Sequence, residues 1–175
     1  MASTYTLISS NVLSSSAASV TFSSIPSTYT DLVLRYSGRQ TGTSDVQDDI
    51  YLSINGAPSG TSYSETKLNG NGATATSNRN SNQPQWALEQ GLDAGGNTAN
   101  TFASGEIYIP NYTVSQNRVS SSFTANEDNA TTAYLRARAH LYQNTTAITS
   151  LQLKVGSGQN FASGSSFYLY GVKNS

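Results

Sequence analysis

The run Thr145–Lys173, TTAITSLQLKVGSGQNFASGSSFYLYGVK, decides the fold class. Its first part, Leu151–Val155, alternates apolar and polar residues with the two-residue period of a half-buried strand. Its last part, Phe167–Val172, is aromatic or apolar on both faces, which favours a strand inside a sheet rather than at its edge. Between them, Gly156–Ser166 contains three glycines and clusters of small polar residues, which is loop chemistry. The stretch therefore predicts two β-strands against which the rest of the chain builds its sheets.

The composition favours an all-β domain. The 175 residues are 36% hydrophobic and only 11% charged, with a net charge of −1. A disordered chain of this polarity usually carries a strong net charge, whereas this one has 11 Tyr and 5 Phe to bury. Length and composition predict one β-sandwich domain over residues 1–175.

Alternating segments recur along the whole chain and predict about eight to ten strands in an antiparallel, jelly-roll-like β-sandwich. The cleanest alternation is Ala133–Tyr142, and Gly72–Gln85 is so poor in apolar residues that we expect a long exposed loop. In the first of these segments we expect Leu135, Ala137, Ala139 and Leu141 to point inward, and Tyr134, Arg136, Arg138 and His140 to point outward.

Several classes of function are disfavoured. Nine Lys and Arg spread over the chain do not make a phosphate-binding surface, so we expect no nucleic-acid partner. The absence of cysteine excludes disulfides, thiolate metal sites and cysteine nucleophiles. No apolar run approaches the length of a membrane span, and the N-terminus lacks the features of a signal peptide.

Residues of catalytic or metal-binding type are present but do not form a motif. His140 is the only histidine, so a Ser-His-Asp triad would depend on it, and a solvated His on a polar face is the favoured interpretation. The acidic group Asp45, Asp48 and Asp49 lacks the pattern of an EF-hand loop and reads as a solvated loop. We therefore expect a non-enzymatic protein without cofactor or metal. The carboxylates that could serve a glycosidase, but that nothing pairs in the sequence, are Glu65, Asp93, Glu106 and Glu127.

Aromatic residues near predicted loops and strand ends are candidates for partner binding. Trp86, Tyr108 and Tyr112 could form an exposed platform for a sugar or a protein, although core or corner positions are the commoner fate of such residues. Tyr5 and Leu7 in the N-terminal segment are further candidates. The contact elements that we expect are residues 1–8 and the Gly72–Gln85 segment.

Several phrases of this sequence resemble a family of tailed-phage virion proteins, as found in phages of aquatic bacteria. The N-terminal part, TYTLISSNVLSSSAASVTFSSIPSTYTDLVLRYSGR, is similar to the opening of that family. The resemblance covers most of the chain and is weakest over Ala73–Thr101. The other phrases that carry it are LSINGAPSGTSYSETKLNGNG (Leu52–Gly72), IYIPNY (Ile107–Tyr112), AITSLQLKV and NFASGSSFYLYGVK.

The resemblance implies a structural protein of the virion surface that is assembled in the host cytoplasm, with no catalytic residues to transfer. The leading hypothesis is a capsid decoration or cement protein that binds the major capsid protein and other virion proteins, as a homo-oligomer for which a trimer is the first guess. The alternative is a fibre or receptor-binding module that recognises host surface glycan. A hydrolase acting on polysaccharide is the third hypothesis.

Overall fold

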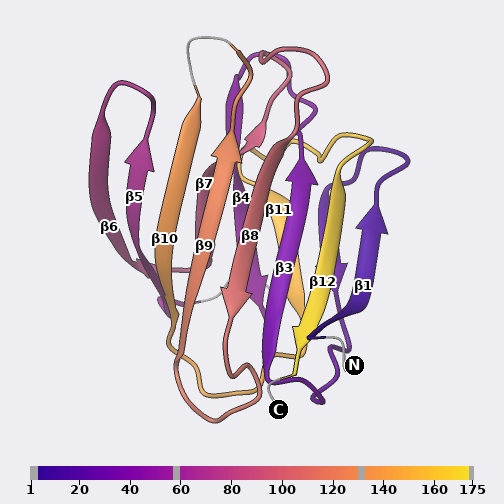
Figure 1. Cartoon of the computed structure of the whole chain (residues 1–175), viewed down its shortest axis with the longest axis vertical. Coiled ribbons are helices and arrows are strands. Elements are labelled where there is room, and N and C mark those ends of the chain that lie inside the picture. The colour runs from indigo at the N-terminus through magenta and orange to yellow at the C-terminus, as the bar shows by residue number, and fades with distance from the viewer. Residues whose placement is uncertain (1–3, 57–59, 130–132, 174–175) are drawn as a thin grey trace.

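The computed structural model describes residues 4–56, 60–129 and 133–173, which form 12 strands in two antiparallel sheets (Figure 1). The all-β sandwich predicted from the sequence is confirmed, with more strands than the eight to ten expected. The strands are β1 (Tyr5–Val12), β2 (Ser19–Phe22), β3 (Asp31–Gly38), β4 (Gln47–Ile54), β5 (Tyr63–Gly70), β6 (Ala75–Gln83), β7 (Trp86–Asp93), β8 (Ala103–Ile109), β9 (Arg118–Asn126), β10 (Tyr134–Tyr142), β11 (Leu151–Val155) and β12 (Ser166–Val172).

Eight of the strands follow the order of a jelly roll. The smaller sheet has the order β2-β11-β4-β7, and one half of the larger sheet has the order β1-β12-β3-β8. These two four-stranded halves face each other, as in a jelly roll of two Greek keys. The C-terminal pair takes part in both layers, because β11 lies between β2 and β4 while β12 lies between β1 and β3.

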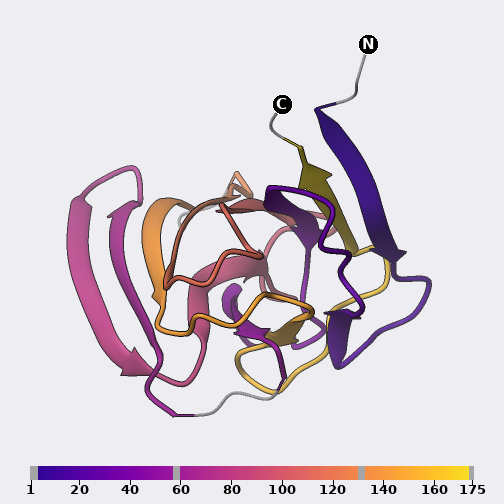
Figure 2. The same ribbon diagram turned by 90° about the horizontal axis from the view of Figure 1, so that it is seen from below.

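Two hairpins extend the larger sheet beyond this jelly roll. The β9–β10 hairpin lies between β8 and β11 in the chain, and the β5–β6 hairpin lies between β4 and β7. In space they continue the larger sheet in the order β8-β9-β10-β5-β6. Figure 2 shows β5 and β6 curling away on the side of the molecule opposite to β1. The eight-stranded sheet is therefore wider than the four-stranded sheet that covers it.

The hydrophobic core lies between the two four-stranded halves. Alternating residues of β3 and β12, such as Leu34 and Leu169, meet Leu52 and Leu153 of the smaller sheet, and all four are fully buried. The aromatic rings of Phe161 and Phe167 pack edge to face, with their centroids 4.9 Å apart. Because apolar side chains are needed only on these inner faces, a low apolar fraction is enough to build the core.

The segment Gly72–Gln85, expected as a loop, contains strand β6, so this prediction is wrong. Its strand pairs with β5 in antiparallel register from Gly70 opposite Ala75 to Tyr63 opposite Gln83. Nearly all of its side chains are exposed because it is the edge of the sheet, and an edge strand that packs on nothing needs no apolar residues. No helix able to cross a membrane occurs among the described residues.

Candidate functional site

The alternation of β10 has the opposite orientation to the one that the sequence predicts. Arg136, Arg138 and His140, expected to point to solvent, are buried between the sheets with at most 3% of their surface exposed. Leu135, expected to be buried, is 52% exposed. The inward prediction is also wrong for Ala137 and Ala139, which are exposed, and for Leu141, which is partly exposed, and Tyr134 is only partly exposed.

The same inversion occurs on the neighbouring strands. Val119 and Phe123 of β9 point outward and are 63% and 50% exposed, while Ser120, Ser122 and Thr124 of the same strand are buried. In this half of the molecule the outside of the sheet is therefore apolar and its inside is polar. We call the outward side chains of β5, β9 and β10 the outer apolar face: Leu68, Val119, Phe123, Ala125, Leu135, Ala137, Ala139 and Leu141.

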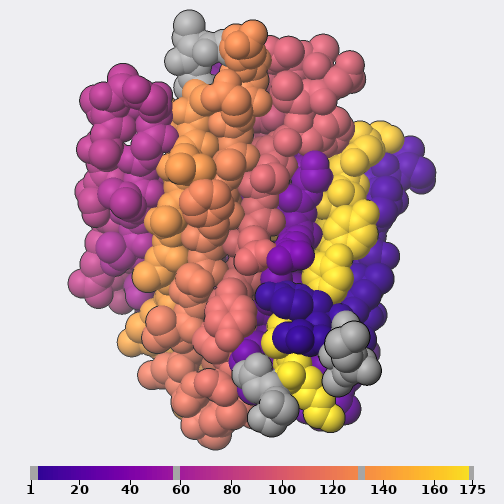
Figure 3. All heavy atoms as spheres, in the orientation of Figure 1, coloured from indigo at the N-terminus to yellow at the C-terminus, as the bar shows by residue number. Residues whose placement is uncertain are grey.

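Strand register brings these residues side by side. Ala137 lies opposite both Leu68 on β5 and Phe123 on β9. The row continues across β8 and β3 through Glu106 and Arg35, which form an exposed ion pair at 2.6 Å. A hollow of about 250 Å³ adjoins Phe123 beside this ion pair. Figure 3 views this side of the molecule, with β9 and β10 in salmon and orange beside the magenta-purple β5–β6 hairpin.

Three of the partner-binding candidates are exposed on the same sheet. The ring of Tyr5 packs edge to face against Tyr170, and the Arg35 guanidinium lies over both rings, 5.4 Å and 5.8 Å from their centroids. Leu7 pairs with Tyr170 across β1 and β12 and is 51% exposed. Tyr108 donates a hydrogen bond of 2.8 Å to Asp31, which raises the pKa of the Tyr108 hydroxyl to about 12. These residues extend the accessible surface beyond the outer apolar face.

The other two candidates are buried, so the prediction that they contact a partner is corrected. Trp86 is 1% exposed, stacks near His140 and donates from its indole Nε1 to the Leu141 carbonyl at 3.0 Å. Tyr112 is fully buried and its hydroxyl donates to the Pro26 carbonyl. Each ring fills a corner of the sandwich while its polar atom finds a backbone partner, which is the usual fate of a buried Trp or Tyr.

The polar inner face has a structural cause, which is the free edge of β7. This strand ends the smaller sheet, and its pairing with β4 is interrupted by a bulge between Leu88 and Leu92, where Gln90 has a φ of 49°, so the carbonyl groups of the bulge have no strand partner. Side chains of the larger sheet donate to three successive carbonyls: Arg138 to that of Glu89 at 2.8 Å, Asn126 to that of Gln90 at 3.3 Å and Tyr36 to that of Gly91 at 3.0 Å. Strands that cover such an edge need hydrogen-bond donors on their inner side. Because side chains alternate along a strand, the apolar residues of β9 and β10 then point outward.

His140 forms part of an acid–histidine–serine row. Its Nδ1 lies 3.5 Å from a Glu65 carboxylate oxygen, and its Nε2 lies 2.8 Å from the Ser122 hydroxyl. The order of groups is that of a catalytic triad, but all three side chains are buried between the sheets. Burial and then the nearby Arg138 charge lower the pKa of His140 to about 3, while burial raises the pKa of Glu65. The His140 imidazole is hydrogen-bonded through Nε2 to Ser122, whereas Nδ1 and the facing Glu65 Oε2 have no hydrogen-bond partner among the described residues.

Several of the acidic residues named from the sequence have partners of their own. Asp48 accepts the backbone N–H of Asp49 at 2.7 Å, and Asp49 accepts that of Gln90 at 2.6 Å. Glu106 lies on the outside of the sheet, whereas Glu65 lies inside. Within residues 4–56, 60–129 and 133–173 no three His, Cys, Asp or Glu side chains are placed to hold a metal ion.

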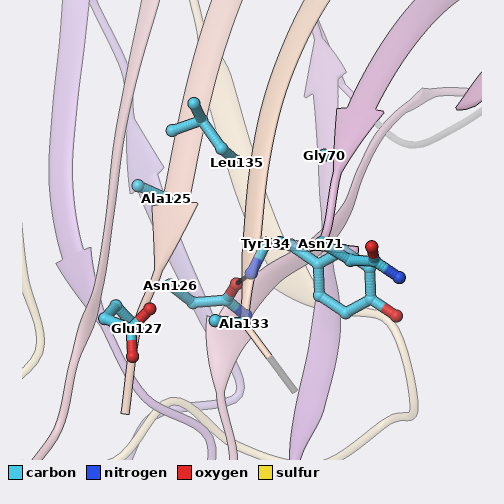
Figure 4. A pocket seen from close by; sticks show the side chains of 9 residues that line it. Gly70, Asn71, Ala125, Asn126, Glu127, Ala133, Tyr134 and Leu135 are labelled. Atoms are coloured by element: carbon cyan, nitrogen blue, oxygen red, sulfur yellow. Dashed lines mark hydrogen bonds between the residues drawn. The ribbon is translucent and has the colours of Figure 1, made fainter. Parts of the chain in front are cut away.

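A second hollow, of about 380 Å³, lies where β5, β9 and β10 meet at their ends. Figure 4 shows the ring of Tyr134 beside Asn71 at this place, and Asn126 accepts the Tyr134 backbone N–H at 2.8 Å. Leu135 and Ala125 line the same hollow, so it continues the outer apolar face to the end of the sheet.

Most residues of the outer apolar face were missed as candidates because alternation gives the period of a strand but not which side faces the core. One signal was available. Arg136, Arg138 and His140 form one face of β10, and a strand with such a face next to a partner strand of serines is a candidate for polar burial.

Comparison with known proteins does not identify the chain. No protein-family model matches it, and no curated protein matches it either. Among solved structures, alginate lyase vAL-1 from Chlorella virus aligns at 8% identity, over 93% of this chain and 83% of that chain, with a TM-score of 0.26. A match of this quality carries no argument about fold or activity.

Proposed function

We propose that this chain is a structural, non-enzymatic protein of a virion surface that adheres to another particle protein through its outer apolar face. The observation that carries the proposal is the inverted orientation of β9 and β10. Monomeric proteins keep wide apolar patches away from water, and patches larger than a few hundred Å² mark interaction sites. Here the outward positions of two adjacent strands are apolar except for Ser121, and such a surface is expected to be covered by a partner.

The size of the face suits a contact of moderate strength. Leu68, Val119, Phe123 and Leu135 are each about half exposed. Completing the burial of each side chain would contribute roughly 1 kcal/mol, and the four together about 4–6 kcal/mol. Such a contact is weak for one copy, because association itself costs several kcal/mol. A particle surface compensates by offering many equivalent sites to an oligomer.

The assignment to a virion is supported by the sequence resemblance described above. We propose the phage head as the location, the major capsid protein as the main partner and a closed homo-oligomer, with a trimer as the first guess, as the binding form. Cysteine-free, weakly charged chains suit assembly in a reducing host cytoplasm. Light scattering on the purified chain measures the oligomeric state.

The test is binding to undecorated heads of the virus that encodes the chain, measured by co-sedimentation. The wild-type protein is expected to bind, and Phe123→Thr to bind about 5- to 13-fold more weakly, since ~1–1.5 kcal/mol of burial at this half-exposed ring is lost. Val46→Thr is the matched control, because Val46 is 43% exposed but lies outside the outer apolar face. Absence of wild-type binding, or equal binding by both variants, would refute the proposal.

The fibre or receptor-binding alternative, which recognises host surface glycan, is the second candidate. Of the three rings predicted to form a sugar-stacking platform, Trp86 and Tyr112 are buried, whereas Tyr108 is 38% exposed. A glycan site in this molecule therefore has to be built without Trp86 and Tyr112.

A further inference from the structure

An open groove lies on the inner side of the larger sheet, where that sheet extends past the smaller one. Its volume is about 400 Å³, and five strands contribute side chains to it. The concave side of β5, β6 and β10 forms one wall, and the free edge of β7 forms the other. The groove and the outer apolar face lie on opposite sides of the same strands.

The charged groups in the groove are already matched within the protein. Lys67 forms an ion pair with Glu89, and the Arg136 guanidinium contacts the Gln90 side chain and lies 3.8 Å from the centroid of the Tyr134 ring. With Asp49, the lining holds two carboxylates and two cations. A groove with balanced charge offers no net attraction to a polyanion or a polycation.

The hydrogen-bonding groups that remain are uncharged. Thr76 and Asn78 project from the inner side of β6, and the Asn78 side chain, unlike that of Thr76, makes no hydrogen bond to another described residue. Asn69 Oδ1, on the neighbouring strand, is buried and has no partner among the described residues. The Asn78 amide offers two donors and an acceptor to a ligand in the groove, whereas the Asn69 Nδ2 already donates to Thr76 Oγ1 at 3.5 Å.

From these observations we propose that the groove between β6 and β7 binds a neutral saccharide. A sugar hydroxyl both donates and accepts hydrogen bonds, so it can pair with a side-chain amide or a threonine hydroxyl, whereas an apolar ligand cannot. The volume has room for roughly one or two sugar rings. Since the outer apolar face points away from the groove, the site would stay open on a chain that is docked through that face, and the inference is independent of the docking proposal.

The test is affinity electrophoresis of the full chain through gels that contain one soluble polysaccharide each. The neutral set is dextran, galactomannan, xylan and a mixed-linkage β-glucan, and the acidic set is alginate and polygalacturonate. At least one neutral polymer is expected to retard the protein, and Asn78→Ala is expected to weaken that binding about three- to ten-fold, the effect of one lost hydrogen bond. The matched control is Ser77→Ala, the next residue of β6, which pairs with Leu68 on the opposite side of the sheet.

Three outcomes would overturn the inference: no retardation by any neutral polymer, retardation by the acidic set alone, or equal affinity of Asn78→Ala and Ser77→Ala for the neutral polymer that binds. Equal melting temperatures of the two variants establish that an effect is not one of folding. Phe123→Thr, which tests docking on heads, should be retarded like the wild type, so failure of one proposal is distinguishable from failure of the other.

Discussion

The orientation of β10 can be tested by the stability of one substitution, Leu135→Thr. If the apolar residues of this strand pointed inward, this change would remove a core leucine. In the structure Leu135 is 52% exposed, and threonine is a good strand former. We therefore expect the free energy of unfolding to fall by at most about 1 kcal/mol, which is roughly half of what full burial of a leucine contributes.

The matched control is Leu153→Thr in β11. Leu153 is fully buried between the sheets, so the same chemical change leaves a cavity and an interior hydroxyl. Large-to-small changes of core leucine cost about 2–5 kcal/mol, and an unpaired buried hydroxyl adds roughly 1–3 kcal/mol. The two leucines should therefore differ several-fold in their effect.

The assay is urea unfolding followed by circular dichroism. With a slope of about 2 kcal/mol per molar urea, the midpoint should shift by less than ~0.5 M for Leu135→Thr and by about 1.5–4 M for Leu153→Thr. Each protein is measured at two concentrations, so that loss of self-association is not mistaken for loss of folding stability. Equal shifts for the two variants would mean that Leu135 is a core residue, and the outer apolar face would not exist as described.

Two further substitutions test the interior. Because burial holds the pKa of His140 at about 3 while the unfolded chain titrates near 6.5, stability should be full above pH 6.5 and decline as the pH falls toward 3. Between pH 7 and pH 4.5 the urea midpoint should fall less for His140→Gln than for the wild type. The raised pKa of Glu65 acts with the opposite sign at the acid end. A wild-type midpoint that is the same at both pH values would contradict this. Gly105→Ala should cost about 1–3 kcal/mol, because its Cβ would lie 2.4 Å from the buried Tyr36 ring, while Gly70→Ala, with no side-chain atom within 4 Å of its Cβ, should leave the melting temperature unchanged. A melting temperature of Gly105→Ala equal to that of Gly70→Ala would show that the Tyr36 ring moves freely.

The sequence predicts the jelly roll well because its core strands have one covered face and one exposed face. In β11, the alternation of Leu151, Leu153 and Val155 predicts both that the segment is a strand and which of its faces is buried, since few other residues could fill the core. The prediction of which face is buried fails in β10, where there is a physical reason to bury either face. The apolar residues favour burial, but the free carbonyls of β7 require donors, and Arg138 supplies one. This requirement comes from a strand that ends a different sheet, so local periodicity does not contain it.

Strand β6 was missed for a related reason. Ala75–Gln83 has almost no apolar residues, and hydrophobic alternation indicates a strand only where one face of it is buried. The information present was Asn69-Gly70-Asn71-Gly72, a turn signal followed by a stretch about as long as the strand before it. An edge hairpin exposed on both faces is recognised from its turn rather than from its alternation. The groove depends on this hairpin, so alternation alone does not predict it.

The three side chains that donate to the β7 carbonyls also bear on how the molecule avoids misassembly. An unprotected sheet edge is a template on which a foreign segment, or the same segment of another molecule, can nucleate amyloid-like stacking. At β7 the acceptors are already occupied by Arg138, Asn126 and Tyr36, so an incoming strand would have to displace interior groups. Protection of this kind needs no surface lysine or proline, and it makes β7 a poor template for edge-to-edge pairing.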